Sequence, residues 1–302
     1  MTGIILLNYH TFEETVNCIS SVRKFVSSPY HIYLVDDSCD GEEEKRLQTA
    51  FGNSDDVTLM ILPDNPGYSG GNNAGARKAV EDGADAILIM NSDIILENDI
   101  VDAMRTHLSD NAVVLPKVSL PDGSNGQALM KNFRYRYSLA SKIALGRRLQ
   151  RYIPFLSISF PIKDWNQPVQ FSGMGMGCCF LIDSGIFKQI GYLDDHVFLY
   201  FEENILGIKL EERGLKTYYE PSARVIHKHG TATEKASRAK KYYRFYRSEI
   251  YLLQQYCHVS GFRMRLLLHY LRKDYKRIAC VETEYAEYWQ ILEEYIASAV
   301  CR

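Results

Sequence analysis

Polar side chains suited to binding and proton transfer follow several aliphatic runs in the first half of the sequence. The segments are Asn8-Tyr9, Asp36-Asp37, Asp64-Asn65 and Asn91-Ser92-Asp93. If the aliphatic runs are parallel strands, their carboxyl ends share one edge of a sheet, where open α/β proteins bind their ligands. Any one of these residues could instead only cap the helix that follows it. Because the pattern recurs at strand after strand, it indicates a site in one crevice.

Asp93 is the candidate metal ligand of this crevice. Mg²⁺ and Mn²⁺ prefer oxygen donors and usually complete their shells with water and substrate phosphates. His227 and His229 follow a further expected strand, ARVIH, and one imidazole could join the carboxylate. Since alternate residues of a strand point to opposite faces, at most one of the two histidines faces such an ion. A purely structural histidine is the alternative.

Glu202 and Glu203 are adjacent acids at the start of an expected helix, in the segment LYFEENILGIKLEERG. Either could act as a general base, which must lie within hydrogen-bond reach of the proton it removes. The alternative is that both acids only favour the helix dipole, by about 0.3 to 1 kcal/mol each. The residues alone leave both interpretations open.

A glycine-rich segment, NPGYSGGNNAG, precedes another expected helix. Its glycines permit positive φ and a close approach of the backbone to a ligand, and the exposed amides of a helix N-terminus suit a phosphate. The segment is neither a Walker loop nor a dinucleotide fingerprint, because no Gly-Lys-Ser/Thr follows and Gly-x-Gly-x-x-Gly is absent. A plain tight turn is the competing interpretation.

The elements that must position these residues alternate along the chain. We expect strands at residues 3–9, 31–37, 57–63 and 84–93, and helices at 11–25, 41–51 and 70–83. The strands lack strict polar and apolar alternation, as strands covered on both faces do. This pattern predicts a parallel sheet with covering helices. A second block, residues 171–214, adds a strand, a short helix, a loop and an acidic helix, and the chain beyond His229 looks helical.

Composition narrows the class of protein. The chain has 302 residues, a formal net charge of -2 and 46% hydrophobic residues, which is typical of a folded protein without a general attraction to nucleic acid. With no zinc spacing or RNA-binding aromatic motif, we expect no nucleic acid partner. The odd number of cysteines, 7, without Cys-x-x-Cys spacing argues against a disulfide framework. Since no stretch resembles a leader or a membrane span, we expect a cytoplasmic protein.

Taken in order, these motifs resemble those of the inverting family 2 glycosyltransferases of the GT-A fold, and most closely their rhamnosyltransferase-like branch. The segments that carry the resemblance are IILLNYH, YLVDDSCDG, DNPGYSGGNNAGARKA, LIMNSDIIL, GYLDDHVFLYFEENILGIKLEERG and ARVIHKHG. The resemblance implies a GT-A (nucleotide-diphospho-sugar transferase) fold with a mostly parallel central sheet flanked by helices. The expected units are a GT-A domain at 1–230, with a nucleotide-binding half (1–115) and an acceptor and catalytic half (116–230), and a C-terminal helical region at 231–302.

The resemblance also implies roles for individual residues. Asn91-Ser92-Asp93 occupies the position of the Asp-x-Asp motif, so Asp93 would bind a Mg²⁺ or Mn²⁺ ion that bridges the donor phosphates, with His227 near it. Glu203 matches the acid that acts as catalytic base. The expected nucleotide-binding residues are Tyr9, which stacks on the base, Asp36, which bonds base or ribose, Asn65, Gly67, Ser92, Asn72 and Asn73 in the segment that closes over the nucleotide, and Arg247 toward the phosphates.

Two departures from the family pattern bear on the chemistry. Asn91 replaces the first acid of the motif and leaves the metal site with less negative charge. Glu203 stands where the family usually has Asp, and Ile205 where a second Asp is frequent, so Glu202 could serve as the base instead. These departures motivate an alternative function, a non-catalytic GT-A-like protein that binds glycans or acts as a scaffold.

The implied activity is an inverting, metal-dependent transfer of a sugar from a nucleoside diphosphate donor, either dTDP-rhamnose or a UDP-sugar. The acceptor would be a glycan or a lipid-linked oligosaccharide, with a role in bacterial surface polysaccharide synthesis. A sugar-phosphate nucleotidyltransferase is the nearest other enzyme. It needs an N-terminal glycine-rich loop with Arg and Lys, which GIILLNYHTFEET lacks.

Basic and aromatic residues are interleaved between Arg238 and Arg277. Such a segment can lie on an anionic membrane surface, where each Lys or Arg contributes about 1 kcal/mol. Lipid-linked acceptors would agree with peripheral contact at the inner face of the cell membrane. The alternative is an amphipathic helix packed on the domain with its basic face in water. Exposed tyrosine-rich helices could also pair two chains in a homodimer.

Overall fold

The computed structural model describes residues 1–228, 237–280 and 284–300. Its first elements are β1 (Thr2–Asn8), α1 (Phe12–Phe25), β2 (Tyr30–Asp36), α2 (Gly41–Phe51), β3 (Val57–Ile61), α3 (Gly67–Glu81) and β4 (Ala86–Asn91). The strands coincide with the aliphatic runs. The Asp40 carboxylate accepts from the Glu42 amide at the start of α2, and acids occupy the first turn of α1. α3 begins at Gly67, earlier than the start predicted at residue 70.

The following part of the chain forms shorter strands and further helices. They are β5 (Ile94–Leu96), α4 (Ile100–Arg105), β6 (Val113–Ser119), β7 (Met130–Lys131), α5 (Tyr135–Lys142), α6 (Ala144–Leu149), η1 (Pro154–Leu156), β8 (Val169–Phe171), β9 (Gly173–Met174), β10 (Cys179–Asp183), α7 (Ser184–Gln189), α8 (Glu202–Glu211), β11 (Thr217–His227), α9 (Arg238–Gln255), α10 (Gly261–Ala279) and α11 (Tyr285–Val300). The strand predicted at ARVIH is the last part of the longer β11.

Within the described residues, a 9-stranded sheet has the order β3-β2-β1-β4-β10-β6-β11-β5, with β8 paired to β11 beside this path. β3, β2, β1 and β4 are parallel neighbours, as the sequence predicts. β10 runs antiparallel between β4 and β6, whereas β6 and β11 are parallel and β5 is antiparallel to β11. The sheet is therefore mostly parallel, and β1, β2 and β4 end on the same edge.

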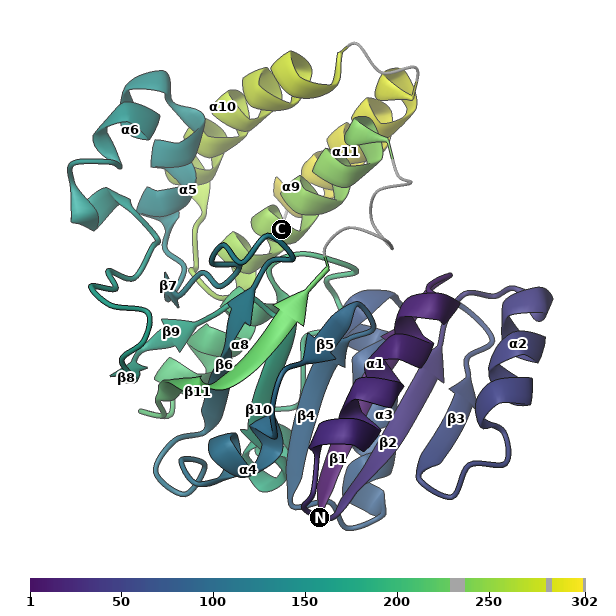
Figure 1. Ribbon diagram of the computed structural model, residues 1–302. Helices are drawn as coiled ribbons and strands as arrows, with labels where there is room; N and C mark the ends of the chain where they lie inside the picture. The colour runs from purple at the N-terminus through teal and green to yellow at the C-terminus, as the bar shows by residue number, and fades with distance from the viewer. Residues whose placement is uncertain (229–236, 281–283, 301–302) are drawn as a thin grey trace.

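Helices cover both faces of this sheet (Figure 1). Leu6 and Leu88 point to the face packed by α1, α2 and α4. Ile5 and Ile87 point to the opposite face, which α3, α7 and α8 cover. Because neighbouring strand residues alternate between the two faces, continuous aliphatic runs supply both halves of the core.

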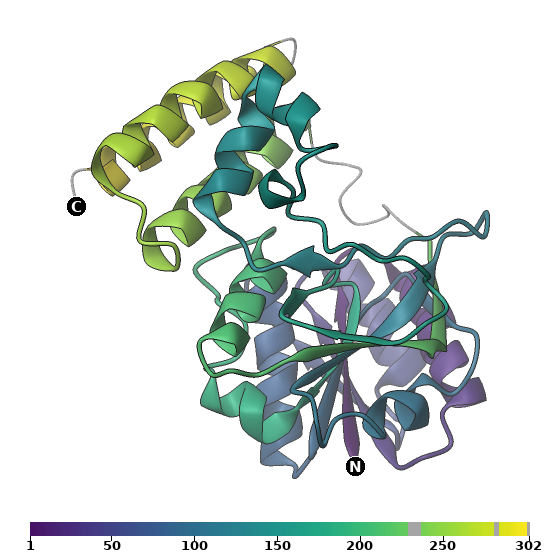
Figure 2. The same ribbon diagram turned by 90° about the vertical axis from the view of Figure 1, so that its left-hand side faces the viewer.

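The helices α5, α6, α9, α10 and α11 lie together beyond the carboxyl edge of the parallel strands (Figure 2). A hydrophobic cluster that includes Ile205 of α8 and Tyr246 of α9 joins α9, α10 and α11 to the sheet domain. Lys142 of α5 and Glu249 of α9 form a buried ion pair with an Nζ to Oε2 distance of 2.7 Å. This shared core fixes α9 relative to the strand ends, while the boundary predicted at residue 230 stays a prediction.

Candidate active site

A cavity of about 770 Å³ lies at the carboxyl edge of the parallel strands, within the usual size range of small-molecule sites. The walls come from the ends of β1, β2 and β4, the starts of α3 and α8, and the first turns of α9. Of the predicted site residues, Tyr9, Asn65, Gly67, Ser92, Asp93, Glu202, Glu203 and His227 line it. Asp36, Asn72, Asn73 and Arg247 are not on its walls. The predicted metal ligands and bases thus share one cavity.

Asp93 and His227 meet because β5 and β11 are antiparallel neighbours. Ile94 pairs with His227, and the Lys228 amide donates to the Asp93 carbonyl at 3.0 Å. Asp93 Oδ1 lies 3.1 Å from His227 Nε2, and both side chains are buried. Burial lowers the pKa of His227, but hydrogen bonds to Asp93 and Cys178 outweigh this and raise the pKa to about 10.

The Asp93 and His227 side chains are suitable donors for a divalent cation. A carboxylate oxygen and an imidazole nitrogen on one wall fit Mn²⁺, and Mg²⁺ through the oxygen, with other positions left to phosphates and water. The imidazole must lose its proton to bind a metal, so binding would release that proton. His229, the other candidate, lies outside the described residues.

Asn91, which replaces the first acid of the motif, is held by Tyr68. The Tyr68 hydroxyl lies 3.0 Å from Asn91 Oδ1 and 2.7 Å from the Gly177 carbonyl oxygen. Burial, and then the charge of Glu202, raises the pKa of Tyr68 well above its usual range, so the hydroxyl keeps its proton. Asn91 is therefore part of a bridge between β4 and the segment before β10. Tyr68 was not among the predicted site residues, although it lies within the glycine-rich segment.

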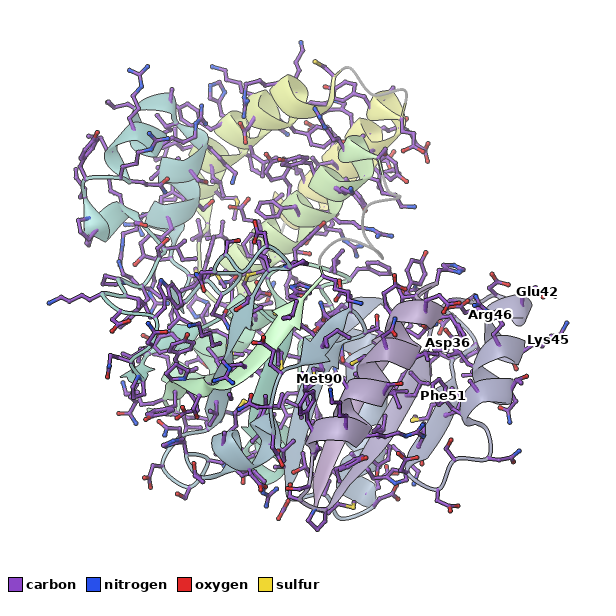
Figure 3. The ribbon with its side chains drawn as sticks, viewed as in Figure 1. Asp36, Glu42, Lys45, Arg46, Phe51 and Met90 are labelled. Carbon is purple, nitrogen blue, oxygen red and sulfur yellow. The ribbon has the colours of Figure 1, made fainter. Side chains whose placement is uncertain are left out.

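The adjacent acids Asp36 and Asp37 occupy different places. Asp36, at the end of β2 (Figure 3), accepts from Asn8 Nδ2 at 2.7 Å and from Ser38 Oγ at 2.5 Å. Asp37 lines the cavity, and its buried Oδ1 has no hydrogen-bond partner among the described residues. Burial, and then the charge of Asp36, raises the pKa of Asp37 to about 7. Asp36 therefore ties strand ends together, and Asp37 is the acid placed to meet a ligand.

The start of α3 makes a close backbone approach to the segment before α8. Gly67 has a φ of 78°, and a Cβ atom there would lie 2.3 Å from the Phe198 carbonyl oxygen. The Tyr68 amide donates to the same carbonyl at 2.9 Å, and Asn65 Oδ1 accepts from the Gly67 amide at 2.9 Å. Gly67 is thus required by the backbone, and Asn65 fixes the turn beside the cavity.

Asn72 and Asn73 face the protein interior. Asn72 Nδ2 donates to the Tyr68 carbonyl at 2.9 Å. Asn73 Nδ2 donates to the Leu193 carbonyl at 2.9 Å, and its Oδ1 accepts from the Leu193 amide at 3.0 Å. Both side chains are buried. The Asn72 bond lies within α3, whereas the Asn73 bonds hold α3 to the segment that contains Leu193.

Glu202 and Glu203 begin α8 and line the cavity. They follow Tyr200 and Phe201, whose φ angles of 72° and 69° cost about 1 to 3 kcal/mol each in non-glycine residues. Burial raises the pKa of Glu203 to about 7. Burial, and then the charge of Glu203, raises the pKa of Glu202 well above its usual range. The partly buried Glu203 is therefore the acid of the pair that ionises more readily.

α9 forms a basic wall of the cavity. Lys240, Lys241 and Arg244 line it, and the Arg244 guanidinium carbon lies 4.1 Å from the centre of the Phe198 ring. Arg247 is exposed and lies over the Tyr295 ring instead, 5.5 Å from its centre. Arg244 is thus the arginine that faces the cavity, in place of the predicted Arg247.

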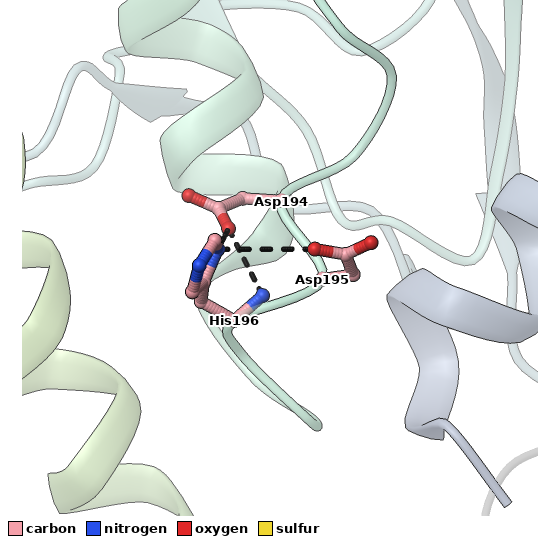
Figure 4. Close-up of side chains that lie close together, drawn as sticks. All are labelled: Asp194, Asp195 and His196. Carbon is pink, nitrogen blue, oxygen red and sulfur yellow. Dashed lines mark hydrogen bonds and ion pairs between the residues drawn. The ribbon is translucent and has the colours of Figure 1, made fainter.

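Asp194, Asp195 and His196 form a second group of possible metal ligands, away from the cavity walls (Figure 4). Asp194 accepts hydrogen bonds from the Tyr256 hydroxyl at 2.6 Å and the Tyr251 hydroxyl at 3.0 Å. It also accepts from the His196 amide at 3.0 Å. These bonds use both carboxylate oxygens of Asp194 to join the loop before α8 to α9. The close approach of the three side chains therefore has a structural explanation that needs no metal ion.

The sequence is similar to those of known glycosyltransferases. The model of glycosyl transferase family 2 matches residues 4–191. The low-salt glycan biosynthesis hexosyltransferase Agl10 of Haloferax volcanii is 30% identical over 208 residues, which are 67% of this chain and 58% of that protein. The N-acetylglucosaminyl-diphospho-decaprenol L-rhamnosyltransferase of Mycobacterium tuberculosis is 38% identical over 63 residues, 20% of each chain. The chain thus spans little more than half the length of the first relative.

Solved structures support the fold. GalNAc-T7 with UDP, GalNAc and Mn²⁺ has a TM-score of 0.59 at 15% identity, covering 99% of this chain and 58% of that one. S. aureus TarS in complex with UDP has a TM-score of 0.52 at 12% identity, covering 91% and 72%. No helix in the described parts of the chain is long and apolar enough to cross a membrane. The structural similarities confirm the predicted GT-A fold. The family model covers more than half of the chain, and the chain therefore belongs to glycosyl transferase family 2.

Proposed function

We propose that this chain transfers a hexosyl or deoxyhexosyl group from a nucleoside diphosphate donor to a hydroxyl of a glycan or lipid-linked acceptor, with inversion at the anomeric carbon. The observation that carries the proposal is that one cavity at the strand ends holds both Asp93 with His227 and Glu202 with Glu203. Ligand binding at this edge is general in open α/β sheets. Membership of the family supports sugar transfer itself.

Donor binding is divided between the sheet edge and α9. Tyr9, half exposed in the cavity wall, offers its ring for stacking on the base, and Asp37 offers an acceptor for a base or ribose donor group. Lys240 and Arg244 offer positive charge to the diphosphate. Asp93 and His227 would hold Mg²⁺ or Mn²⁺, which when bound neutralises charge on the leaving diphosphate.

Glu203 is the proposed base. Its carboxylate takes the proton of the acceptor hydroxyl while the hydroxyl oxygen forms a bond to the anomeric carbon. The bond from this carbon to the diphosphate oxygen breaks on the opposite face, so a single displacement inverts the centre. A base with a pKa near the working pH combines ionisation with basicity, and the raised pKa of Glu203, about 7, meets this condition. Glu202 is more deeply buried and keeps its proton at higher pH.

The donor is proposed to be dTDP-rhamnose or a UDP-sugar. The mycobacterial rhamnosyltransferase supports the first over a short segment, and the UDP bound to GalNAc-T7 and TarS supports the second. The Haloferax relative supports a role in glycan biosynthesis, and we propose that the product is a surface glycan.

The test is release of nucleoside diphosphate from dTDP-rhamnose, UDP-glucose, UDP-galactose and UDP-galactofuranose, with Mn²⁺ and a lipid-linked or soluble glycan acceptor. We expect acceptor-dependent release from one donor. Donor binding without turnover across the panel would favour the non-catalytic scaffold instead. The departure at Asn91 that motivated this alternative has a structural account, since its side chain is held by the Tyr68 hydroxyl.

A further inference from the structure

An exposed apolar patch lies on the helical region and takes no part in the cavity. Its members are Leu145, Tyr152, Ile153, Phe155 and Phe262. Tyr152 is 81% exposed, Phe262 71%, Phe155 65% and Leu145 63%. The other exposed large apolar residues in the described ranges, Met1, Tyr9 and Ile61, belong to the sheet domain and are far apart in sequence. A concentration of this kind marks an interaction surface.

Contacts join the two segments that form the apolar patch. The Arg136 guanidinium carbon lies 4.3 Å from the centre of the Phe155 ring, and Arg136 Nε donates to the Phe155 carbonyl at 2.9 Å. The adjacent Tyr135 donates its hydroxyl to the carbonyl of Arg263 at 3.0 Å, next to Phe262. α5 also packs against both α6 and α10. Arg136 and Tyr135 thus bring the segment with Phe155 and the start of α10, which carries Phe262, against the same helix α5.

The segments that carry the apolar patch are rich in basic residues. Residues 131–163 contain no Asp or Glu. Arg148 and Arg151 are exposed between Leu145 and Tyr152, and Arg265 is exposed near Phe262.

Two acids close to this end are paired with arginines, and a third, Glu212, lies in a shared pocket with Arg136 and Arg263. Glu211 pairs with Arg134 at 2.5 Å, and Asp274 pairs with Arg277 at 2.7 Å and approaches Arg147 at 3.9 Å. Arg148, Arg151 and Arg265 have no ion pair with another described residue, so the patch presents apolar side chains together with positive charge.

We propose that this patch docks the chain on an anionic lipid surface. Aromatic and aliphatic tips would enter the interfacial zone, and the arginines would meet phosphate head groups. A second copy of the chain fits this surface less well. In a symmetric contact, Arg148 and Arg151 of one copy would face Arg148 and Arg151 of the other, and their positive charges would repel. The surface shares Phe262 and Arg265 with the basic segment predicted at Arg238–Arg277. The rest of that segment is used differently, since Arg244 lines the cavity and Arg272 pairs with Glu293 at 2.7 Å. The inference does not depend on the transfer reaction.

The experiment is flotation of the full chain with vesicles of phosphatidylcholine alone or mixed with phosphatidylglycerol, at low and at high salt. We expect wild type to float with the anionic vesicles at low salt. Arg148→Glu/Arg151→Glu should lower the partition coefficient by at least about tenfold, since each basic residue near such a surface contributes about a fivefold factor. Tyr152→Ser/Phe155→Ser should lower it on anionic vesicles at both salt concentrations.

The matched control is Lys45→Glu/Lys188→Glu, which makes the same charge change at exposed positions of the sheet domain. It should float like wild type. Failure of wild type to bind anionic vesicles at low salt, or equal losses in the control, would overturn the proposal. So would a stable dimer in analytical ultracentrifugation that Tyr152→Ser/Phe155→Ser dissociates, because the patch would then be a contact between chains. Since the substituted side chains are exposed, circular dichroism should report unchanged folding.

Discussion

Asp93 Oδ1 lies 3.1 Å from His227 Nε2, in a contact that joins β5 to the last residue of β11 at the edge of the sheet. The two residues are far apart in sequence, and the pairing of Ile94 with His227 brings them together. The same cavity contains the start of α8, so the proposed metal ligands and the proposed base belong to one site. This relationship is the basis of the mechanism proposed above.

Glu203→Gln should lower kcat by about 10² to 10⁴, because it removes the proposed general base. In wild type, kcat/KM should rise as pH increases through about 7, since Glu203 must be ionised to accept a proton and its pKa is about 7. The measurement is the pH profile of nucleoside diphosphate release. An unchanged kcat, with the same rise through pH 7 in Glu203→Gln, would assign the base elsewhere; Glu202→Gln tests the adjacent acid.

Glu203→Gln should also stabilise the protein above pH 7. The pKa of Glu203 is raised in the folded state from an ordinary value of 4.5 to about 7. The contribution of protonated Glu203 to the free energy of unfolding is therefore complete below pH 4.5 and is lost as pH rises through 7. Gln does not ionise, so the variant avoids this loss. We expect a gain of about 1 to 3 kcal/mol at pH 8 and little difference at pH 4. Urea unfolding at the two pH values measures it, with the exposed Glu44→Gln as control.

Tyr68→Phe should lower kcat by about tenfold, because the hydroxyl that holds Asn91 and the Gly177 carbonyl is lost next to the site. Tyr33→Phe is the matched control. It removes a hydroxyl bonded to Asp82 at 3.0 Å, on a residue that does not line the cavity.

Both tyrosine variants should lose about 1 kcal/mol of stability, but only Tyr68→Phe should affect transfer. Equal kcat values for the two variants would show that the bridge from Tyr68 to Asn91 has no part in the reaction.

Arg244→Ala should raise the KM for the donor by about tenfold or more, because its guanidinium faces the cavity where the diphosphate is proposed to bind. Arg247→Ala, one helical turn away, should leave KM unchanged, since that side chain lies over Tyr295. The comparison uses steady-state kinetics with the identified donor. The reverse order of effects would mean that α9 presents a different face to the donor.

The strand ends could be predicted from sequence because aliphatic runs followed by Asp or Asn mark them directly. This located Asp93 and His227 on one sheet edge. The sequence could not distinguish Asp36 from Asp37. Hydrogen bonds from Asn8 and Ser38 hold Asp36 in the protein interior, which leaves Asp37 to line the cavity. The antiparallel β10 between β4 and β6 was not predicted either, since strand order depends on long-range pairing.

Helix faces were harder to predict than strand ends. Arg244 and Arg247 have the same chemistry, and the rotation of α9 about its axis decides between them. That rotation is set by the packing of Tyr246 and Ile250 into the cluster shared with α8, which requires knowledge of the whole fold. Asn72 and Asn73 were predicted near the nucleotide from the glycine-rich motif, and the contacts of Asn73 with the Leu193 backbone show why a motif does not identify the exposed face.

The most direct test of the central claim is a crystal of the chain grown with Mn²⁺ and the nucleoside diphosphate of its donor, examined by anomalous diffraction at the manganese edge. We expect the manganese peak within about 2.3 Å of an Asp93 carboxylate oxygen, with the diphosphate on its other side. Asp93→Ala should abolish the peak. A manganese ion bound at Asp194, or a diphosphate seated in the cavity with no metal beside Asp93, would contradict the account.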